Sequence, residues 1–342
     1  MIALVKTHPG PGNVKLTEVK EPNPGFGQVK IAVQYCCICG TDLKIKKDLA
    51  PSNPPVVLGH EFCGIVYEIG EGVKNFKKGD RVVSETMAYY CGSCKYCQTG
   101  NYFMCDHRLS AGYGVDGGFA EFCVIREGAL HKLPDNVSFE QGALAEPLAV
   151  CVHFVIERSK IKPGDFVLVS GTGAIGLLAA FVAKTAGAYV ILAGMSCDIK
   201  RLKIGKEIGV NRIINIEEED LSSVVKEITA GYGVDKAYEC AGAVASVQNC
   251  IQSLSKGGTL TQVGLTEKLV PTDFNQISRK ELNIVGSFGH NWANWETSIY
   301  LLKNFGDVIS KIISDILPLE KWEEAFKKME DRESIKILLY PH

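Results

Sequence analysis

The chain has 342 residues, of which 46% are hydrophobic and 22% are charged, and its formal net charge is -2. This length predicts two domains or one large one, and the balanced charge argues against a nucleic-acid or anionic membrane partner. We find neither a signal-peptide pattern nor an apolar run of the roughly 18 residues that a transmembrane helix needs. Thirteen cysteines in a chain without a signal-peptide pattern indicate a reducing compartment, the cytoplasm, in which the thiols are free or bound to metal.

Short β-prone runs separated by glycine and proline turns make up residues 1 to about 148. Strands are expected at 1–6, 28–33, 64–69 and 80–83. Pairs such as Pro24-Gly25 lie between them and favour turns. This pattern predicts a compact β-rich domain.

Within this part, Cys39 and the pair His60-Glu61 offer a thiol, an imidazole and a carboxylate among small and apolar residues. These are ligand types that a catalytic zinc prefers, and such a site leaves a position open for water or substrate. Glu146 is a candidate fourth, exchangeable ligand. Taken singly, a His-Glu pair is more often a surface ion pair, and a buried cysteine is usually a small hydrophobe.

Four further cysteines stand close together, with two successive C-x-x-C steps, Cys91, Cys94 and Cys97, followed by Cys105. Four thiolates on one loop suit a closed tetrahedral zinc site that stabilises the loop. An iron–sulfur cluster is the other metal interpretation, but the spacing is not that of a ferredoxin.

A helix is expected to begin near Ser138, because Ser138 and Gln141 have capping-box spacing. It would carry Glu146 and continue through Cys151 and His153. An apolar face around His153 favours a packed core histidine.

From Gly164 onward, short apolar runs alternate with helical stretches. Strands are expected at 166–170, 189–193, 212–216, 234–240 and 259–263, with helices at 177–186, 199–208, 221–229 and 244–255. Runs without alternation are typical of parallel strands buried on both faces. The alternation predicts right-handed βαβ units and a doubly wound parallel sheet, an α/β fold.

A glycine fingerprint, Gly171, Gly173 and Gly176, lies between the first of these strands and its helix. In this context the glycines allow the turn, the approach of a pyrophosphate and close helix–strand packing. The helix N-terminus then offers free N–H groups to phosphates. The alternative is a glycine-rich turn without a ligand.

The later strands complete the predicted organisation. Cofactors of doubly wound sheets lie at the carboxyl ends of the strands, so 263–265 should lie near a nicotinamide. A strand at 283–288 follows, and a closing strand at 336–339 should return to the first domain. We therefore expect a catalytic domain at 1–148, completed by 285–342, and a dinucleotide-binding domain at 149–284.

Taken together, these motifs resemble the zinc-dependent medium-chain dehydrogenases, and most closely the branch of sorbitol (L-iditol) and L-threonine dehydrogenases. The resemblance implies a GroES-like catalytic domain and a Rossmann domain. It implies catalytic zinc on Cys39, His60 and Glu61, with Glu146 as a ligand or beside one, and structural zinc on Cys91, Cys94, Cys97 and Cys105. Cofactor contacts are implied for Ile175, Arg201, Val263, Gly264, Leu265, Ser287, Phe288 and Gly289. Tetramers are usual in such families, and a dimer is the alternative.

The implied activity is reversible oxidation of a secondary alcohol, preferably a polyol, to a ketone, with hydride transfer to a nicotinamide. Thr41 is expected to pass the proton outward. Lys44 stands where threonine dehydrogenases carry histidine, so threonine becomes a less expected substrate. Gly289 stands where sorbitol dehydrogenases carry arginine, so the polyol contacts of those enzymes are not fully reproduced. Alternatives are an L-threonine 3-dehydrogenase, a sugar or sugar-phosphate dehydrogenase, and a catalytically silent zinc- and nucleotide-binding protein.

The choice between NAD and NADP depends on the loop after the second strand of the Rossmann domain. Gly194 occupies the place of the acid that normally binds the ribose 2′-hydroxyl. Ser196, with Lys200 or Arg201, could bind a 2′-phosphate, which favours NADP with NAD also accepted. Alternatively, Asp198 folds back and takes the ribose contact.

Overall fold

The computed structural model describes residues 1–341, which divide into two compact units. One unit is Met1–Glu146 together with the segment that begins at Asn291, and the other is Pro147–His290. The first unit is therefore discontinuous in sequence, whereas the second is one uninterrupted segment. Among the described residues no helix combines the length and apolar character that a membrane crossing needs.

The first unit is rich in strands, as its turn-broken sequence predicts. Its strands are β1 (Ile2–Lys6), β2 (Val14–Glu18), β3 (Gln28–Cys37), β4 (Val56–Val57), β5 (Glu61–Ile69), β6 (Arg81–Ser84), β7 (Met87–Tyr89), β8 (Leu109–Ser110), β9 (Phe122–Arg126), β10 (Leu130–Lys132), β17 (Ile313–Pro318) and β18 (Lys336–Tyr340). Its helices are α1 (Gly40–Lys46), α2 (Lys95–Gln98), α3 (Phe139–Gly142), α10 (Trp292–Ile309) and α11 (Trp322–Glu330), and α4 (Ala145–Val152) continues into the second unit.

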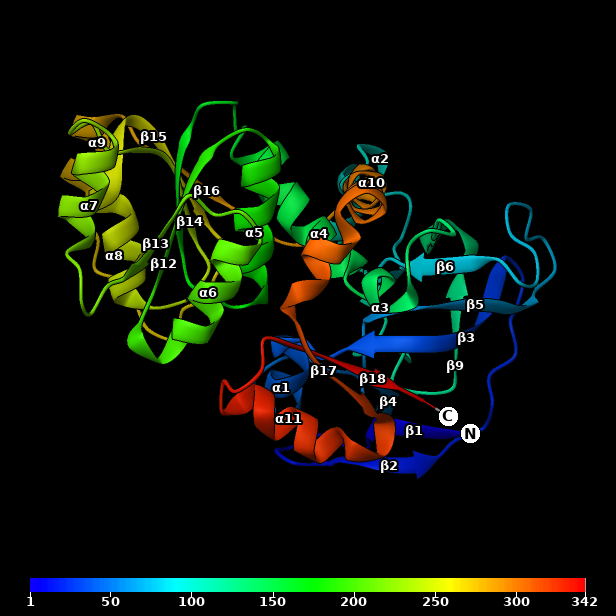
Figure 1. Ribbon diagram of the computed structural model, residues 1–342. Coiled ribbons are helices and arrows are strands. Elements are labelled where there is room, and N and C mark those ends of the chain that lie inside the picture. The colour runs from blue at the N-terminus through cyan, green and yellow to red at the C-terminus, as the bar shows by residue number, and fades with distance from the viewer. Residues whose placement is uncertain (342) are drawn as a thin grey trace. The chain divides into compact units, whose positions relative to one another are not determined.

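The main sheet of the first unit places distant segments of the chain side by side. Its strand order is β10-β6-β5-β3-β18-β17, with β9 also paired to β3. Strand β3 thus lies between β5 and β18. Figure 1 shows β18, in red, beside β3. Cys37 at the end of β3 is opposite Glu61 on one side and Leu338 on the other. The C-terminal strand therefore reaches the neighbourhood of His60 and Glu61.

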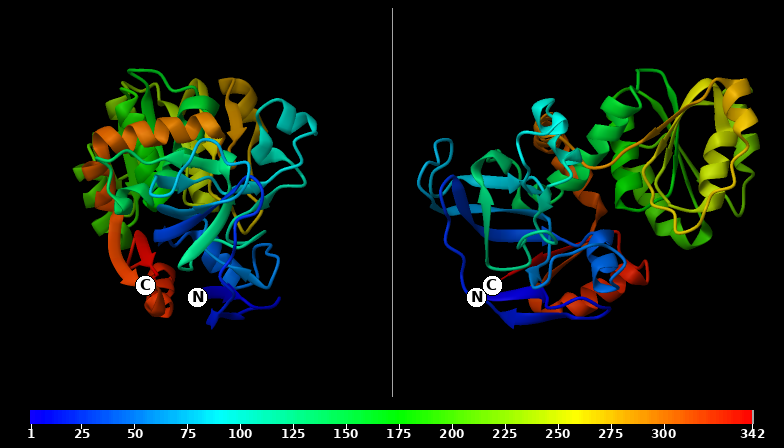
Figure 2. Two further views of the ribbon diagram at one scale, coloured as in Figure 1. Left: turned by 90° about the vertical axis from the view of Figure 1, so that its right-hand side faces the viewer. Right: turned by 180° about the vertical axis from the view of Figure 1, so that it is seen from behind.

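The second unit alternates strands and helices. Its strands are β11 (Phe166–Ser170), β12 (Tyr189–Gly194), β13 (Arg212–Asn215), β14 (Val234–Glu239), β15 (Leu254–Gln262) and β16 (Asn283–Gly286), and its helices are α5 (Ala174–Thr185), α6 (Ile199–Glu207), α7 (Leu221–Ile228), α8 (Val244–Ser253) and α9 (Phe274–Lys280). The sheet is parallel in the order β13-β12-β11-β14-β15-β16, which is the Rossmann order 3-2-1-4-5-6. Figures 1 and 2 show helices on both faces of this sheet. The predicted α/β fold with a doubly wound sheet is therefore confirmed.

Some elements differ from the sequence-based expectation. The capping box of Ser138 and Gln141 is present, but the helix is divided into α3 and α4, followed by a π-helical stretch, His153–Arg158. Helix α1 was not expected, since its seven residues are too few to show a helical period. Helices α10 and α11 also lie where only a return to the first domain was expected.

Candidate active site and metal centres

A thiol, an imidazole and a carboxylate converge in the first unit. One ligand atom each of Cys39, His60 and Glu61 lies within 4.8 Å of the others. His60 and Glu61 are buried, at 5% and 1% exposure, while Cys39 is partly exposed. A partly open cluster of sulfur, nitrogen and oxygen donors fits a catalytic zinc, which needs one position for water or substrate. The structure thus brings together the three residues that the sequence picked out.

Local backbone geometry explains this convergence. Cys39 lies two residues beyond the end of β3 and caps α1, and His60 directly precedes β5. Gly59 has φ +89°, and a Cβ atom there would lie 2.7 Å from the sulfur of Cys36 and 2.8 Å from Phe119. A larger residue at position 59 would therefore displace His60 from the end of its strand.

Asp42 holds two of the candidate ligands in place, a role that sequence analysis missed. Its Oδ2 accepts a hydrogen bond from the Cys39 backbone N–H at 2.8 Å, and its Oδ1 lies 3.6 Å from His60 Nδ1. Burial lowers the pKa of His60, but the charges of Asp42 and Cys39 outweigh this and raise it well above its usual value. A carboxylate behind a metal-binding imidazole orients the ring. The signal was the position of Asp42 three residues into a helix that begins after Cys39.

Lys336 is the second residue that sequence analysis missed. From β18, across β3, its ammonium forms an ion pair with Glu61 and donates to the Ile38 carbonyl at 3.3 Å. Both side chains of the pair are almost fully buried, at 4% and 1% exposure. Burial raises the pKa of Glu61, and the charge of Lys336 opposes that rise. Lys336 therefore supplies a countercharge that favours the ionised form of Glu61 against the effect of burial.

Replacing Lys336 by methionine is expected to lower the free energy of unfolding by about 3–5 kcal/mol, because it leaves a buried carboxylate without its partner. Urea denaturation of the chelator-treated protein measures this loss without a contribution from metal. Lys336→Arg is the matched control and should retain most of the stability. Equal losses in the two variants would show that shape rather than charge matters at this position.

Thr41 and Glu146 lie close to this cluster without belonging to it. Thr41 Oγ1 is 3.7 Å from the sulfur of Cys39. Glu146, at 9% exposure in α4, is close enough that its charge raises the pKa of Glu61, after the larger effect of burial. The cluster of atoms within 4.8 Å consists of Cys39, His60 and Glu61. The place of Glu146 therefore fits a reserve carboxylate beside the ligands.

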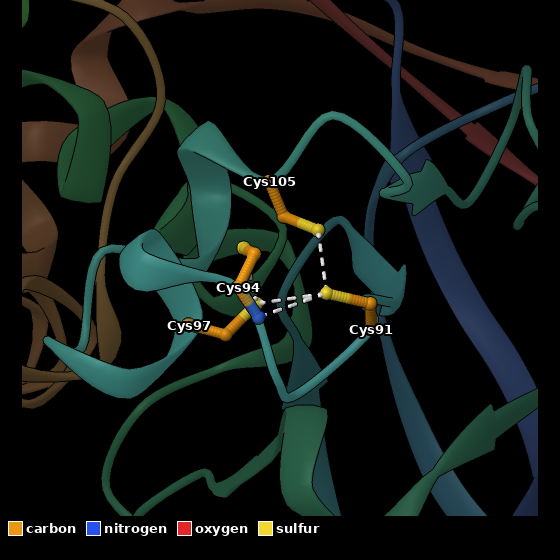
Figure 3. Close-up of side chains that lie close together, drawn as sticks. All are labelled: Cys91, Cys94, Cys97 and Cys105. Carbon is orange, nitrogen blue, oxygen red and sulfur yellow. Dashed lines mark hydrogen bonds between the residues drawn. The ribbon is translucent and has the colours of Figure 1, made fainter.

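The four-cysteine loop folds its sulfur atoms toward one point (Figure 3). Cys91 Sγ lies 3.9 Å from Cys97 Sγ and 3.6 Å from Cys105 Sγ, and Cys94 Sγ lies 3.5 Å from Cys97 Sγ. A tetrahedron with zinc–sulfur bonds of about 2.3 Å has edges of about 3.8 Å, so these spacings fit a closed zinc site. Backbone N–H groups of Ser93 and Cys94 lower the pKa of Cys91 to about 6, which favours the thiolate that binds metal.

A buried polar chain connects this loop to α10. The Tyr102 hydroxyl donates to the fully buried Glu85 at 2.8 Å. Glu85 Oε1 lies 3.1 Å from His131 Nε2, and His131 Nδ1 lies 2.8 Å from Glu296 in α10. Trp295, 1% exposed, stacks on His131 with a ring distance of 5.4 Å, so this tryptophan belongs to the core.

In the second unit, the candidate cofactor residues gather at the carboxyl ends of the parallel strands. The glycine fingerprint follows β11, and Gly194 ends β12. Val263, Gly264 and Leu265 follow β15, and Ser287, Phe288 and Gly289 follow β16. Because the strands are parallel, these carboxyl ends lie on the same side of the sheet.

The glycine fingerprint is closely packed. A Cβ atom on Gly176 would lie 1.9 Å from the Gly171 carbonyl oxygen, so glycine is required there. Thr172 Oγ1 is buried and has no hydrogen-bond partner within residues 1–341, as expected of a group that faces a ligand.

Two family models match the chain. An alcohol dehydrogenase GroES-like domain matches residues 25–135, and a zinc-binding dehydrogenase domain matches residues 174–304. The sorbitol dehydrogenase of Halalkalibacterium halodurans is 42% identical over 100% of this chain and 99% of its own length. The D-arabitol-phosphate dehydrogenase of Enterococcus avium is 39% identical over 99% of this chain and 97% of its own length. A zinc-binding dehydrogenase of Sinorhizobium meliloti 1021, solved with NADP bound, has a TM-score of 0.91 and 31% identity, with 99% of each chain covered.

The fold, the two ligand clusters and these matches agree with one another. The Rossmann sheet and the GroES-like unit are those of a dehydrogenase that uses a nicotinamide cofactor and zinc. This chain is an enzyme of the zinc-dependent medium-chain dehydrogenase family.

Proposed function

We propose that this enzyme reversibly oxidises a secondary alcohol, preferably a polyol, to a ketone at the site formed by Cys39, His60 and Glu61. The observation that carries the proposal is the convergence of these three ligand atoms within 4.8 Å in a partly open site. The identity to a sorbitol dehydrogenase over the whole chain supports a polyol, because sorbitol carries secondary hydroxyl groups.

The residues of the site have distinct tasks in this proposal. Bound zinc supplies a Lewis acid that lowers the pKa of the substrate hydroxyl, and the nicotinamide accepts the hydride. Asp42 orients His60, and Lys336 provides the countercharge of Glu61. In this proposal Thr41 receives the substrate proton and passes it outward, and the 3.7 Å between its hydroxyl and the sulfur of Cys39 supports this role.

Phosphorylated polyols form the main alternative substrate class. The identity to a D-arabitol-phosphate dehydrogenase favours them. The sequence shows no decisive cluster of basic residues for a phosphate on the substrate. Threonine is disfavoured because Lys44 stands where threonine dehydrogenases carry histidine.

Secondary alcohols are expected to be oxidised with a kcat/KM at least about tenfold higher than that of ethanol, a difference of about 1.4 kcal/mol in transition-state stabilisation. Steady-state kinetics with sorbitol, other polyols, 2,3-butanediol, polyol phosphates, threonine and ethanol measures this ranking. If ethanol were turned over faster than every polyol and secondary alcohol, the proposed substrate class would be wrong. A phosphorylated polyol as the best substrate would shift the assignment to the alternative.

The proposal also includes two statements about the enzyme in the cell: it forms a homo-oligomer, and it is located in the cytoplasm. Strand β16 forms an edge of the parallel sheet and exposes Ile284, and the nearby segment exposes Leu269 and Phe274. An exposed apolar sheet edge favours pairing with another chain. The metal-binding thiols require reduced cysteines, which supports a reducing compartment. Light scattering and cell fractionation test the two statements.

A further inference from the structure

The usual position of the ribose-binding acid is occupied by a glycine that has no room for a side chain. Gly194 ends β12, and a Cβ atom there would lie 2.7 Å from Thr172 Cγ2 and 3.3 Å from Asp198 Cβ. Thr172 is 2% exposed, so its side chain has little room to turn away from such an atom. An aspartate at position 194 would therefore strain the loop.

A carboxylate from the next strand lies beside this position instead. Gly194 pairs with Asn215 at the end of β13, and the Ile216 N–H donates to the Gly194 carbonyl at 3.0 Å. Glu217 follows directly, and its Oε2 accepts a hydrogen bond from the Ser196 backbone N–H at 2.7 Å. The Ser196 hydroxyl accepts from Asn215 Nδ2 at 3.0 Å. These contacts fix Glu217 against the loop where the ribose is bound in this fold.

Contacts in this loop also occupy two of the groups that could bind a 2′-phosphate, those of Ser196 and Arg201. The Ser196 backbone N–H, a donor expected for a phosphate, is already bound to Glu217. Asp198 folds back, so that its Oδ2 accepts from the Met195 N–H at 3.2 Å and its Oδ1 lies 3.9 Å from Arg201 Nη1. Arg201, one of the two candidate cations, therefore has a carboxylate partner. Two acids, Asp198 and Glu217, border the loop.

We infer that Glu217 replaces the missing acid at position 194: it accepts a hydrogen bond from the ribose 2′-hydroxyl and repels a 2′-phosphate, so that the enzyme prefers NAD. This revises the preference for NADP that Ser196, Lys200 and Arg201 suggested from the sequence. The inference rests on the proposed function only in requiring a nicotinamide dinucleotide at this edge of the sheet. Thr172, whose methyl carbon borders the Gly194 position, has a buried hydroxyl without a hydrogen-bond partner within residues 1–341, and this independently supports a ligand site at the carboxyl ends of the strands.

Calorimetric titration of the zinc-loaded enzyme with NAD+ and with NADP+ tests the inference. The wild type should bind NAD+ at least about tenfold more tightly, since a carboxylate and a phosphate at close range repel each other by this order. Glu217→Gln should tighten NADP+ binding by about tenfold and change NAD+ binding by less than about threefold, because glutamine keeps an acceptor oxygen. Glu218→Gln, a neighbouring exposed acid, is the matched control and should leave both affinities unchanged.

Each other outcome has a definite meaning. Tighter binding of NADP+ by the wild type, or the same affinity ratio in Glu217→Gln as in the wild type, overturns the inference. A ratio shifted equally by Glu218→Gln would show a general effect of surface charge and overturns it too. If neither dinucleotide bound, both the inference and the proposed function would fail. Binding with the expected ratio, but without oxidation of any alcohol, would leave Glu217 assigned and refute the proposed function alone.

Discussion

Cys39→Ser is expected to contain one zinc ion per chain in place of two and to lose alcohol oxidation by about 10³-fold or more. Serine keeps the size of the side chain but removes the thiolate, the soft ligand of the cluster with His60 and Glu61. A bound zinc contributes several kcal/mol to the transition state, and each 1.36 kcal/mol corresponds to a factor of ten in rate. Metal analysis by mass spectrometry and steady-state kinetics give the two values.

The fold should survive this change, because serine nearly matches the volume of cysteine and the partly exposed Cys39 is not itself one of the buried core residues. Cys123→Ala is the matched control, since Cys123 is buried in the same unit but belongs to neither ligand cluster. It should retain two zinc ions and near-normal turnover. Two zinc ions and ordinary activity in Cys39→Ser would refute the assignment of the catalytic site.

Cys94→Ala is expected to lose the other zinc ion and to destabilise the first unit by roughly 3 kcal/mol or more. Structural zinc contributes on the order of 10 kcal/mol of binding free energy in small zinc-binding peptides, and a loop in which Cys91, Cys94 and Cys97 are partly exposed has little apolar packing to replace it. The effect should extend into the core, because an unfolded loop withdraws the Tyr102 hydroxyl from the buried Glu85. Thermal and urea unfolding, with the zinc content measured on the same samples, test this.

Ser93→Ala, next to Cys94 in the loop, is the control for this experiment. Its hydroxyl lies 3.7 Å from the sulfur of Cys91, but it is not one of the four clustered ligands. It should change stability by less than about 0.5 kcal/mol, as surface substitutions usually do. If Cys94→Ala unfolded at the wild-type temperature, the loop would not depend on metal.

The sequence was most informative where residues adjacent in the chain act together. The cysteine spacing from Cys91 to Cys105, the pair His60-Glu61 and the fingerprint from Gly171 to Gly176 are local patterns, and each follows from backbone geometry over a few residues. The parallel sheet was likewise predictable, because its apolar runs and helices alternate regularly.

Contacts between distant parts of the chain could not be predicted in the same way. Lys336 reaches Glu61, about 275 residues away in sequence, only because β18 pairs with β3, and no local pattern encodes that pairing. Glu217 lies in a run of four acidic residues, 217–220, which by itself indicates only a solvated surface, because the register that sets Asn215 beside Gly194 appears only in the folded sheet. Asp42 was passed over because short helices such as α1 leave no periodic signal.

Because the first unit is built from two separate segments of the chain, the two units can fold at different times during synthesis. The second unit has all its strands once residue 290 has been made, so it can fold while the chain is still growing. The first unit must wait for β17 and β18, and until Lys336 arrives Glu61 has no countercharge in its buried position. The cysteine loop from Cys91 to Cys105 needs no such late segment for its four ligands. The structural zinc can therefore enter the nascent chain early, whereas maturation of the catalytic centre is among the last steps of biosynthesis.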